Sequence, residues 1–335
     1  MYRAAVIGLG NIGLRYDLFN KASPQSHSLA YHLNSNIDFV AAAGVREAQG
    51  DQLALIAPET RFYTDVVAML KENHLDIISI CTPTNVRLEL LRTVFEHSAA
   101  KVIFLEKPVA ASLEEALQIK ALADHHNREV IVNFSRRWSP GAAQMREAVE
   151  TERYGKLKKI HLRYTRGIYN YGSHLFDLVR FVAGPIDHVQ VLRQEHTNLD
   201  VREDWTYSFT FTARDGSITG YAEAFDDKDF LMFEMDLYFE KGKIEMLQSG
   251  DEIRFFGTEA HPLLGGIRQL VLERTEACLN SRSSNIMEAV QHLVQVIKEK
   301  AAPVCSLNDG LYPLYVAQAL QLSHRNNGSV EAISF

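Results

Sequence analysis

The segment NYGSHLFD, at 170–177, carries three polar side chains at helical spacing. His174 follows Asn170 by four residues and precedes Asp177 by three, and such positions share one face of an α-helix. A neutral imidazole can take or return a proton near pH 7. The segment is therefore a candidate for acid–base chemistry. The apolar run that follows it, stopped by Gly184 and Pro185, leaves a purely structural core helix as the alternative.

A second group of residues, GLGNIG at 8–13, has the G-x-G-x-x-G spacing of dinucleotide-binding turns. Gly8 permits a tight turn, Gly10 lets a pyrophosphate approach the backbone, and Gly13 lets helix and strand pack closely. Asn11 and Ile12 complete the motif. It follows an apolar run and precedes an expected helix, whose N-terminus would face the phosphates. The motif predicts binding of NAD or NADP.

The residues after the second apolar run bear on which of the two cofactors binds. That run ends AAGVRE and offers Gly44, Arg46 and Glu47, so an acid that would bind the ribose of NAD is not obvious there. Arg46 tilts the prediction slightly to NADP, because an arginine can accommodate a 2′-phosphate. A solvated loop cation explains Arg46 nearly as well. The stretch YDLFNKASPQSHS, at 16–28, predicts an inserted loop that either covers the site or is inert.

Two further motifs, CTPTN at 81–85 and EKP at 106–108, end apolar runs. Ligands of parallel sheets bind at the carboxyl ends of strands, so both motifs are expected at the cofactor crevice. The candidate contacts are Thr82, Pro83, Asn85, Glu106 and Lys107. The proline after Lys107 disfavours helical geometry there, which places the lysine at a strand end. Most lysines are solvated, but a fixed ammonium at that place would stabilise charge on a substrate oxygen.

The elements that must position these residues fall into two parts. Up to residue 134, apolar runs alternate with helical stretches, which predicts an α/β domain with a doubly wound parallel sheet over 1–134. The runs are 4–8, 39–45, 76–82, 101–106 and 129–134, and the helical stretches include 84–97 and 112–126. Over 135–335 we expect an α+β domain with a large, mostly antiparallel sheet. Its signs are a helix at 141–151, strands at about 188–257 with turns at Asp215-Gly216 and Lys241-Gly242, and helices at 284–299 and 308–324.

Composition excludes several classes of function. The 335 residues carry a net charge of −7, which argues against a nucleic-acid partner. No apolar run approaches the length that spans a bilayer, and the N-terminus lacks the pattern of a signal peptide. The three cysteines lie far apart, which suits neither a disulfide framework nor a zinc site. A cytoplasmic protein without a metal is expected.

Taken together, GLGNIG, CTPTN, EKPVAASLEEALQI and GSHLFDLVRFVAGP resemble landmarks of the Gfo/Idh/MocA family of NAD(P)-dependent oxidoreductases. VNFSRRWSP, YGKLKKI and CSLNDGLYPLYVAQALQLS are similar to that family as well. The resemblance implies a Rossmann domain, an open-faced sheet domain, and a dimer or tetramer. It implies hydride transfer between nicotinamide and a secondary hydroxyl or ketone of a sugar, cyclitol or nucleotide sugar. Members associated with surface-polysaccharide sugars look most similar.

The resemblance also implies roles for individual residues. Lys107 matches the lysine of the family's EKP motif. His174 matches the catalytic histidine of a D-x-G-x-H-x-x-D pattern, and Asp177 matches its last acid. Two departures stand out: Asn170 replaces the first acid, and Arg87 stands where many members carry a histidine. These departures leave a non-catalytic NAD(P)-binding redox or metabolite sensor as the alternative.

Four more residues are candidates for substrate contacts. Arg137 and Trp138, in SRRWSP, could bind an anionic or sugar substrate by charge and stacking. Packing in the linker explains these two residues equally well. Arg166 and Tyr171 are expected to flank the same crevice.

Overall fold

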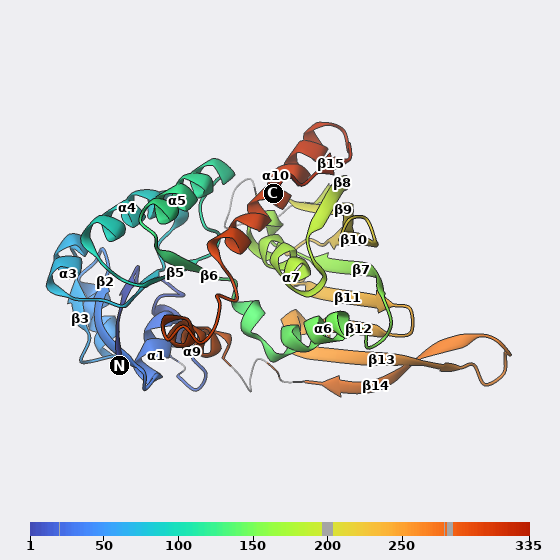
Figure 1. Ribbon diagram of the computed structural model, residues 1–335, viewed down its shortest axis with the longest axis horizontal. Helices are drawn as coiled ribbons and strands as arrows, with labels where there is room; N and C mark the ends of the chain where they lie inside the picture. Colours follow the sequence, from blue (N-terminus) through green and yellow to red (C-terminus); the bar gives the residue numbers. More distant parts are fainter. Residues whose placement is uncertain (20, 196–203, 278, 280–283) are drawn as a thin grey trace. The chain divides into compact units, whose positions relative to one another are not determined.

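The computed structural model describes residues 1–19, 21–195, 204–277, 279 and 284–335 (Figure 1). Its contacts divide the chain into two compact units. The first unit comprises Met1–Trp138 and Ser283–Leu311, and the second comprises Ser139–Arg282 and Tyr312–Phe335. Among the described residues no helix is both long and apolar enough to cross a membrane.

The first unit is built on a six-stranded sheet in which every pair of neighbours is parallel. Its strands are β1 (Tyr2–Ile7), β2 (Ile37–Ala43), β3 (Arg61–Tyr63), β4 (Ile77–Ile80), β5 (Val102–Glu106) and β6 (Glu129–Asn133). They stand in the order β3-β2-β1-β4-β5-β6. The strand order reverses between β1 and β4, and ligands of such sheets bind at that reversal. The sequence missed β3, because three residues are too few to show a period.

Helices cover both faces of this sheet (Figure 1). They are α1 (His27–Leu33), α2 (Ala48–Ala54), α3 (Val66–Glu72), α4 (Arg87–His97), α5 (Leu113–His125) and α9 (Asn285–Ile297). Figure 1 shows α4 and α5 on one side of the sheet and α1 and α9 on the other. Strand side chains such as Val6, Ile77 and Phe104 join the core that α1 and α9 cover. The predicted doubly wound parallel sheet is confirmed.

Helix α9 returns from the far end of the sequence to complete this core. Its buried side chains repeat at helical spacing, as in an amphipathic helix. They are Ile286, Ala289, Val290, Leu293 and Val294. Ser284 caps the helix by accepting the Met287 N–H at 3.3 Å. The sequence predicted the helix but grouped it with the second part of the chain, because a helical period does not say which sheet the apolar face covers.

The second unit contains a nine-stranded sheet in the order β14-β13-β12-β11-β7-β10-β9-β8-β15. The strands are β7 (Leu157–Tyr164), β8 (Ile186–Glu195), β9 (Thr206–Ala213), β10 (Ile218–Ala224), β11 (Phe233–Phe239), β12 (Lys243–Leu247), β13 (Glu252–Ala260), β14 (Arg268–Glu276) and β15 (Glu331–Ala332). Only β7 and β10 pair in parallel among these neighbours. Both predicted turns join antiparallel neighbours, β9 to β10 and β11 to β12. The mostly antiparallel sheet is therefore confirmed.

One face of the nine-stranded sheet packs against helices. These are α6 (Pro140–Glu150), α7 (Ser173–Ala183) and the part of α10 (Leu307–Arg325) from Tyr312 onward. Alternate residues of the strands enter this core, for example Ile160 and Leu162 of β7 and Met235 and Leu237 of β11. The residues between them must point to the opposite face, because successive side chains of a strand alternate.

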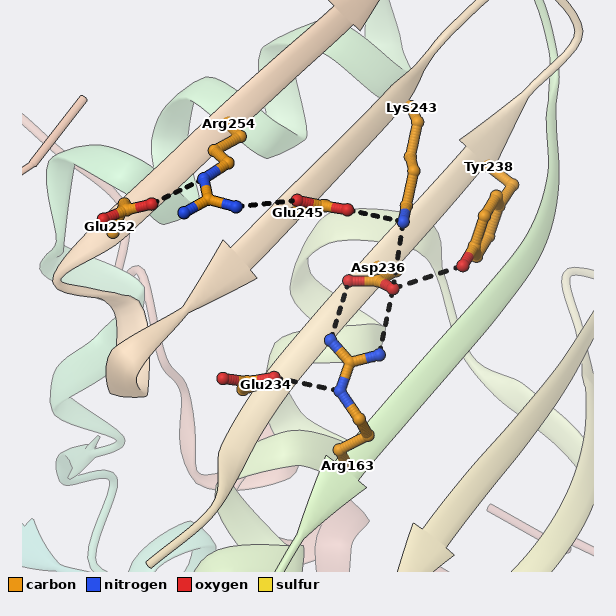
Figure 2. Close-up of polar contacts among 8 residues, drawn as sticks. All are labelled: Arg163, Glu234, Asp236, Tyr238, Lys243, Glu245, Glu252 and Arg254. Atoms are coloured by element: carbon orange, nitrogen blue, oxygen red, sulfur yellow. Dashed lines mark hydrogen bonds and ion pairs between the residues drawn. The ribbon is translucent and has the colours of Figure 1, made fainter. Parts of the chain in front are cut away.

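That opposite face carries an ion-pair ladder across β7, β11, β12 and β13, formed by Arg163, Glu234, Asp236, Lys243, Glu245, Glu252 and Arg254 (Figure 2). The facing carboxylates of Asp236 and Glu245 would repel each other as directly opposite like charges. Lys243 lies between them, with its Nζ 3.3 Å from Asp236 and 2.6 Å from Glu245. Arg163 completes the compensation by binding both oxygens of Asp236 at 3.0 Å.

The charge of Asp236 depends on these cations. Burial by itself raises the pKa of Asp236, but the hydrogen bonds and charge of Arg163, followed by Lys243, outweigh it and bring the pKa below its ordinary value. A carboxyl whose pKa is depressed by folding stabilises the fold above its unfolded pKa, and that contribution is lost as the pH falls through the folded pKa.

We therefore expect Arg163→Met to lower the free energy of unfolding at pH 7 by roughly 3 kcal/mol, because it leaves a buried carboxylate short of a partner. The difference from wild type should narrow at about pH 3, because the Asp236 carboxyl of the variant, which lacks Arg163, takes up its proton at a higher pH than the wild-type carboxyl, whose folded pKa is depressed. Urea titrations at both pH values measure it. Arg254→Met is the matched control: Arg254 is 42% exposed, so its loss should cost less than about 1 kcal/mol. Equal costs for the two variants would contradict the assignment.

Candidate active site

The first unit holds a pocket of about 390 Å³ at the carboxyl ends of β1, β2 and β4. Its lining comprises Ile7, Gly8, Leu9, Gly10, Ala43, Gly44, Val45, Gln49, Thr64, Val66, Cys81, Thr82, Pro83, Val86 and Leu90. The pocket therefore lies at the reversal of strand order, where ligands of such sheets bind. Four residues that the sequence singled out line it, namely Gly8, Gly10, Thr82 and Pro83.

The three motif glycines differ in what requires them. Gly8 has φ +99°, and a Cβ there would stand 2.8 Å from the backbone of Cys81. A Cβ on Gly13 would stand 2.0 Å from the carbonyl oxygen of Gly8. A Cβ on Gly10, in contrast, would meet nothing within 4 Å. The fold requires Gly8 and Gly13, whereas the space beside Gly10 is open to a ligand.

The connection after the motif differs from the prediction of a directly following helix. Gly13 leads into a turn and a short 3₁₀ helix, Arg15–Asp17, and α1 starts only at His27. The amides of His27 and Ser28 bond the carbonyls of Ile12 and Gly13, at 3.0 and 3.1 Å. Helix α1 thus continues the motif's turn. The loop predicted at 16–28 is too long by two residues, because His27 and Ser28 already belong to α1.

Asp17 fastens the end of this insertion to α1. Its buried carboxylate accepts the Gln25 amide at 3.0 Å, and the Ser26 amide and hydroxyl at 2.7 and 2.6 Å. Ser26 in turn caps α1 by accepting the Leu29 amide at 3.3 Å. Among the described residues, none that lines the pocket comes from the insertion. Both alternatives for this loop, a cover for the site and an inert insertion, stay predictions.

The pocket suits a dinucleotide by two features of its wall. The hydroxyl oxygen of Thr82 is buried there and has no hydrogen-bond partner among the described residues, which leaves it available to a polar ligand. Gln49 is buried and joins two strand ends, since its amide donates to the Leu9 carbonyl and accepts the Arg46 amide, at 2.9 and 3.0 Å. The sequence missed Gln49, because nothing local distinguishes it from a surface glutamine.

Other predicted cofactor contacts lie outside the pocket wall. Asn11, Arg46 and Asn85 are exposed, although Arg46 directly follows the pocket residue Val45. Ile12 packs against the core instead. Lys107 is partly buried and directly follows the last residue of β5.

Glu106 is buried at the end of β5 and forms the centre of a polar network. It accepts a hydrogen bond from His27 Nε2 at 2.8 Å and one from the Asn133 amide at 2.5 Å. The other ring nitrogen of His27 lies 2.8 Å from the Ser79 hydroxyl, which Tyr31 also bonds, at 2.6 Å. Burial by itself raises the pKa of Glu106, but its partners, led by His27, bring the pKa below its usual value.

The second unit places the quoted segment at a junction of two helices. A π-helix, Gly167–Gly172, leads into α7, which starts at Ser173. His174 and Asp177 lie in α7 and are buried. Asn170 lies in the wider π turn, so the α-helical spacing that placed all three side chains on one face does not hold for it.

A buried carboxylate stabilises the π turn. Asp204 accepts the amides of Tyr169 and Asn170, at 3.0 and 3.2 Å. Gly167 makes room for it, because a Cβ there would stand 2.1 Å from the Asp204 carboxyl carbon. The sequence missed Asp204, which lies far along the chain in a loop and in no motif.

The structure brings three of the remaining candidates of this unit together around Phe233. The ring of Tyr171 lies 5.6 Å and that of His174 6.5 Å from Phe233, both edge-on. The Arg166 guanidinium lies 5.7 Å from the ring of Tyr171. These contacts form an aromatic cluster with one cation beside the start of α7.

The remaining two candidates pack within the first unit. Arg137 is buried, donates to the Val304 carbonyl at 2.7 Å and lies 3.5 Å from Asp309. The ring centroid of Trp138 lies 6.3 Å from that of Phe104 and 6.0 Å from that of His292. These partners favour the packing alternative, and a substrate contact for either residue stays a prediction. No group of three or more potential metal ligands occurs in the described part of the chain.

A parallel sheet with a glycine turn and a pocket at its reversal of strand order defines a dinucleotide-binding domain. The model of the Gfo/Idh/MocA oxidoreductases, described as "Oxidoreductase family, NAD-binding Rossmann fold", matches residues 2–134. The resemblance seen in the sequence is confirmed over this part of the chain.

The individual relatives share less than 30% of their residues with this chain. An uncharacterized oxidoreductase of Bacillus subtilis is 29% identical over 195 residues, or 53% of each chain. Inositol 2-dehydrogenase of Rhizobium meliloti is 24% identical over 54% of this chain and 55% of its own. The chain thus spans about half the length of these curated relatives. The WlbA dehydrogenase from Bordetella pertussis, in complex with NADH and UDP-GlcNAcA, shares the fold over 100% of this chain and 99% of its own, with a TM-score of 0.76 and 15% identity.

The contrast between the glycines predicts opposite effects of two substitutions. Gly10→Val should leave the melting temperature nearly unchanged and abolish binding of NADH and NADPH, because its side chain fills only the open space beside the turn. Gly13→Ala should lower the free energy of unfolding by about 1–3 kcal/mol through overpacking. Fluorescence titration and thermal unfolding measure the two effects. Normal cofactor affinity in Gly10→Val would place the cofactor elsewhere.

Proposed function

We propose that the protein is an NAD(P)-dependent oxidoreductase that transfers a hydride between nicotinamide and a secondary hydroxyl or ketone of a sugar, cyclitol or nucleotide sugar. The observation that carries the proposal is the pocket beside Gly10 at the reversal of strand order. Its wall contains the Thr82 hydroxyl, for which the described part of the chain offers no hydrogen-bond partner. The family match of residues 2–134 supports it. The bound cofactor would supply or accept the hydride.

The chain's own residues would handle charge and proton. Lys107, at the end of β5, would stabilise the negative charge that develops on the substrate oxygen. His174 would take or return the proton of the hydroxyl. Its ring packs edge-on against Phe233 and is buried, which limits its rotation. Asp177, three residues along α7, would orient it or add negative potential.

Two of the relatives support the proposed substrate class. One is named an inositol dehydrogenase, and the structure of the other contains a nucleotide sugar. Arg166 over Tyr171 would offer a cation and an aromatic face to such a ligand. A homo-oligomer, dimer or tetramer, belongs to the same proposal on the family resemblance alone.

The discriminating experiment incubates the protein with NAD or NADP and a panel of cyclitols, sugars and UDP-sugars, and follows nicotinamide absorbance. Turnover of any member supports the proposed activity. Tight cofactor binding without turnover of any member would favour the sensor, to which the neutral Asn170 also points.

Cofactor choice yields a separate prediction. Arg46 is exposed next to the pocket residue Val45, and no acid precedes it at the end of β2. If Arg46 binds a 2′-phosphate, Arg46→Ala should raise the dissociation constant of NADPH by about tenfold or more, since a charged hydrogen bond contributes about 1.5–3 kcal/mol. The dissociation constant of NADH should stay nearly unchanged. Arg61→Ala, an exposed arginine of β3, is the control. Equal losses for both cofactors would remove Arg46 from the choice.

Substitutions of the two proposed catalytic residues, Lys107 and His174, should have different kinetic effects. Lys107→Ala should lower turnover by roughly 10²–10⁴ and keep cofactor affinity. His174→Ala should remove one limb of the dependence of kcat/KM on pH. Asn170→Asp should move that limb to higher pH, because an added negative charge favours the protonated imidazole. An unchanged pH profile in His174→Ala would make His174 a core residue.

A further inference from the structure

Arg87 is a buried cation that binds backbone carbonyls on both sides of Lys107. It begins α4 and is 4% exposed. Its Nη1 donates to the carbonyls of Glu106 and Pro108. Its Nε and Nη2 donate to the Thr82 carbonyl, at 3.0 and 2.8 Å. One guanidinium thus joins the segments that follow β4 and β5, and both belong to the first unit.

A guanidinium in this position supplies hydrogen-bond donors that carbonyls at the end of a strand generally lack. Carbonyls at and beyond the last residue of a strand leave the sheet's hydrogen bonds, and a buried carbonyl needs another donor. A guanidinium carries five N–H groups in a rigid plane and can bond several acceptors at once. A lysine ammonium is a point charge and lacks this fixed geometry.

The same segment is held from its other side by side chains. His27 and Asn133 bond the Glu106 carboxylate, at 2.8 and 2.5 Å, while Arg87 bonds the Glu106 carbonyl. Both atoms that flank the Lys107 backbone, the carbonyls of Glu106 and Pro108, therefore have one common donor.

We propose that Arg87 is a positioning residue, which fixes the backbone around Lys107 so that the ammonium stands at one place relative to the cofactor pocket. This proposal rests on the proposed function, in which Lys107 stabilises charge on the substrate oxygen. It gives a task to a residue that stands where many members of the family carry a histidine. A structural role alone would require only that Arg87 contribute to stability.

The test uses Arg87→Lys and Arg87→Ala, with Arg92→Lys as the matched control. Arg92 lies on the same helix but is exposed, and it pairs with Glu89 at 3.3 Å. Turnover of Arg87→Lys on a substrate from the panel should fall by roughly 10²-fold, the loss expected from a misplacement of about 1 Å. The dissociation constant of NADH should change far less, and Arg92→Lys should behave as wild type.

A second readout does not depend on knowing the substrate. Trace acetylation with acetic anhydride, read by peptide mass spectrometry, gives the reactivity of Lys107 relative to the exposed Lys71. This ratio should change several-fold in Arg87→Lys and Arg87→Ala. Added guanidinium chloride at sub-denaturing concentration should restore it in Arg87→Ala only. Rescue by the missing group is not expected of a residue that merely stabilises the fold.

The outcomes separate the two proposals. If wild type binds NADH but turns over nothing in the panel, the proposed function fails, and the acetylation ratio still tests the placement of Lys107. If Arg87→Lys folds and keeps normal turnover and a normal ratio, Arg87 is not a positioning residue. If Arg87→Ala does not fold, Arg87→Lys carries the test, because it keeps the charge and most of the length.

Discussion

The buried carboxylate of Glu106 is the constraint on which the first unit's site depends. A charge out of reach of water costs several kcal/mol unless partners compensate it. His27 of α1 and Asn133 of β6 bond the carboxylate, and the charge of Arg87 at the start of α4 also lowers its pKa, while Arg87 bonds the Glu106 carbonyl. Compensating one charge therefore ties three separate stretches of chain to the end of β5. The candidate lysine is the next residue along the chain.

The second unit also compensates a buried carboxylate, here at the junction of two helices. Asp204 is buried, and its oxygens accept two amides of the π turn that precedes α7. Gly167 is required there, since any side chain would collide with that carboxylate. In each unit, a buried acid without a proposed catalytic role holds the backbone near a proposed catalytic residue. Glu106 does so beside Lys107, and Asp204 does so near His174.

The insertion after the glycine motif shows how a fold accommodates extra chain. The hydrogen bonds from His27 and Ser28 to Ile12 and Gly13 preserve the helical turn, and Asp17 closes the inserted loop on itself. With these bonds in place, α1 packs against the sheet. His27, the first residue of α1 after the loop, belongs to the network around Glu106.

The sequence by itself determined the elements and the cofactor turn. Apolar periods and turn residues act locally, so five of the six parallel strands, the two turns and the glycine motif were readable from it. Only the tertiary structure decided which distant residues meet. Contacts between residues far apart in sequence bury Arg87, bring His27 to the Glu106 carboxylate, and place Asp204 against the amides of the π turn. The packing of α9 on the first sheet depends on such contacts too. A local period states that a face is apolar or that a charge is present, but long-range packing decides what lies against it.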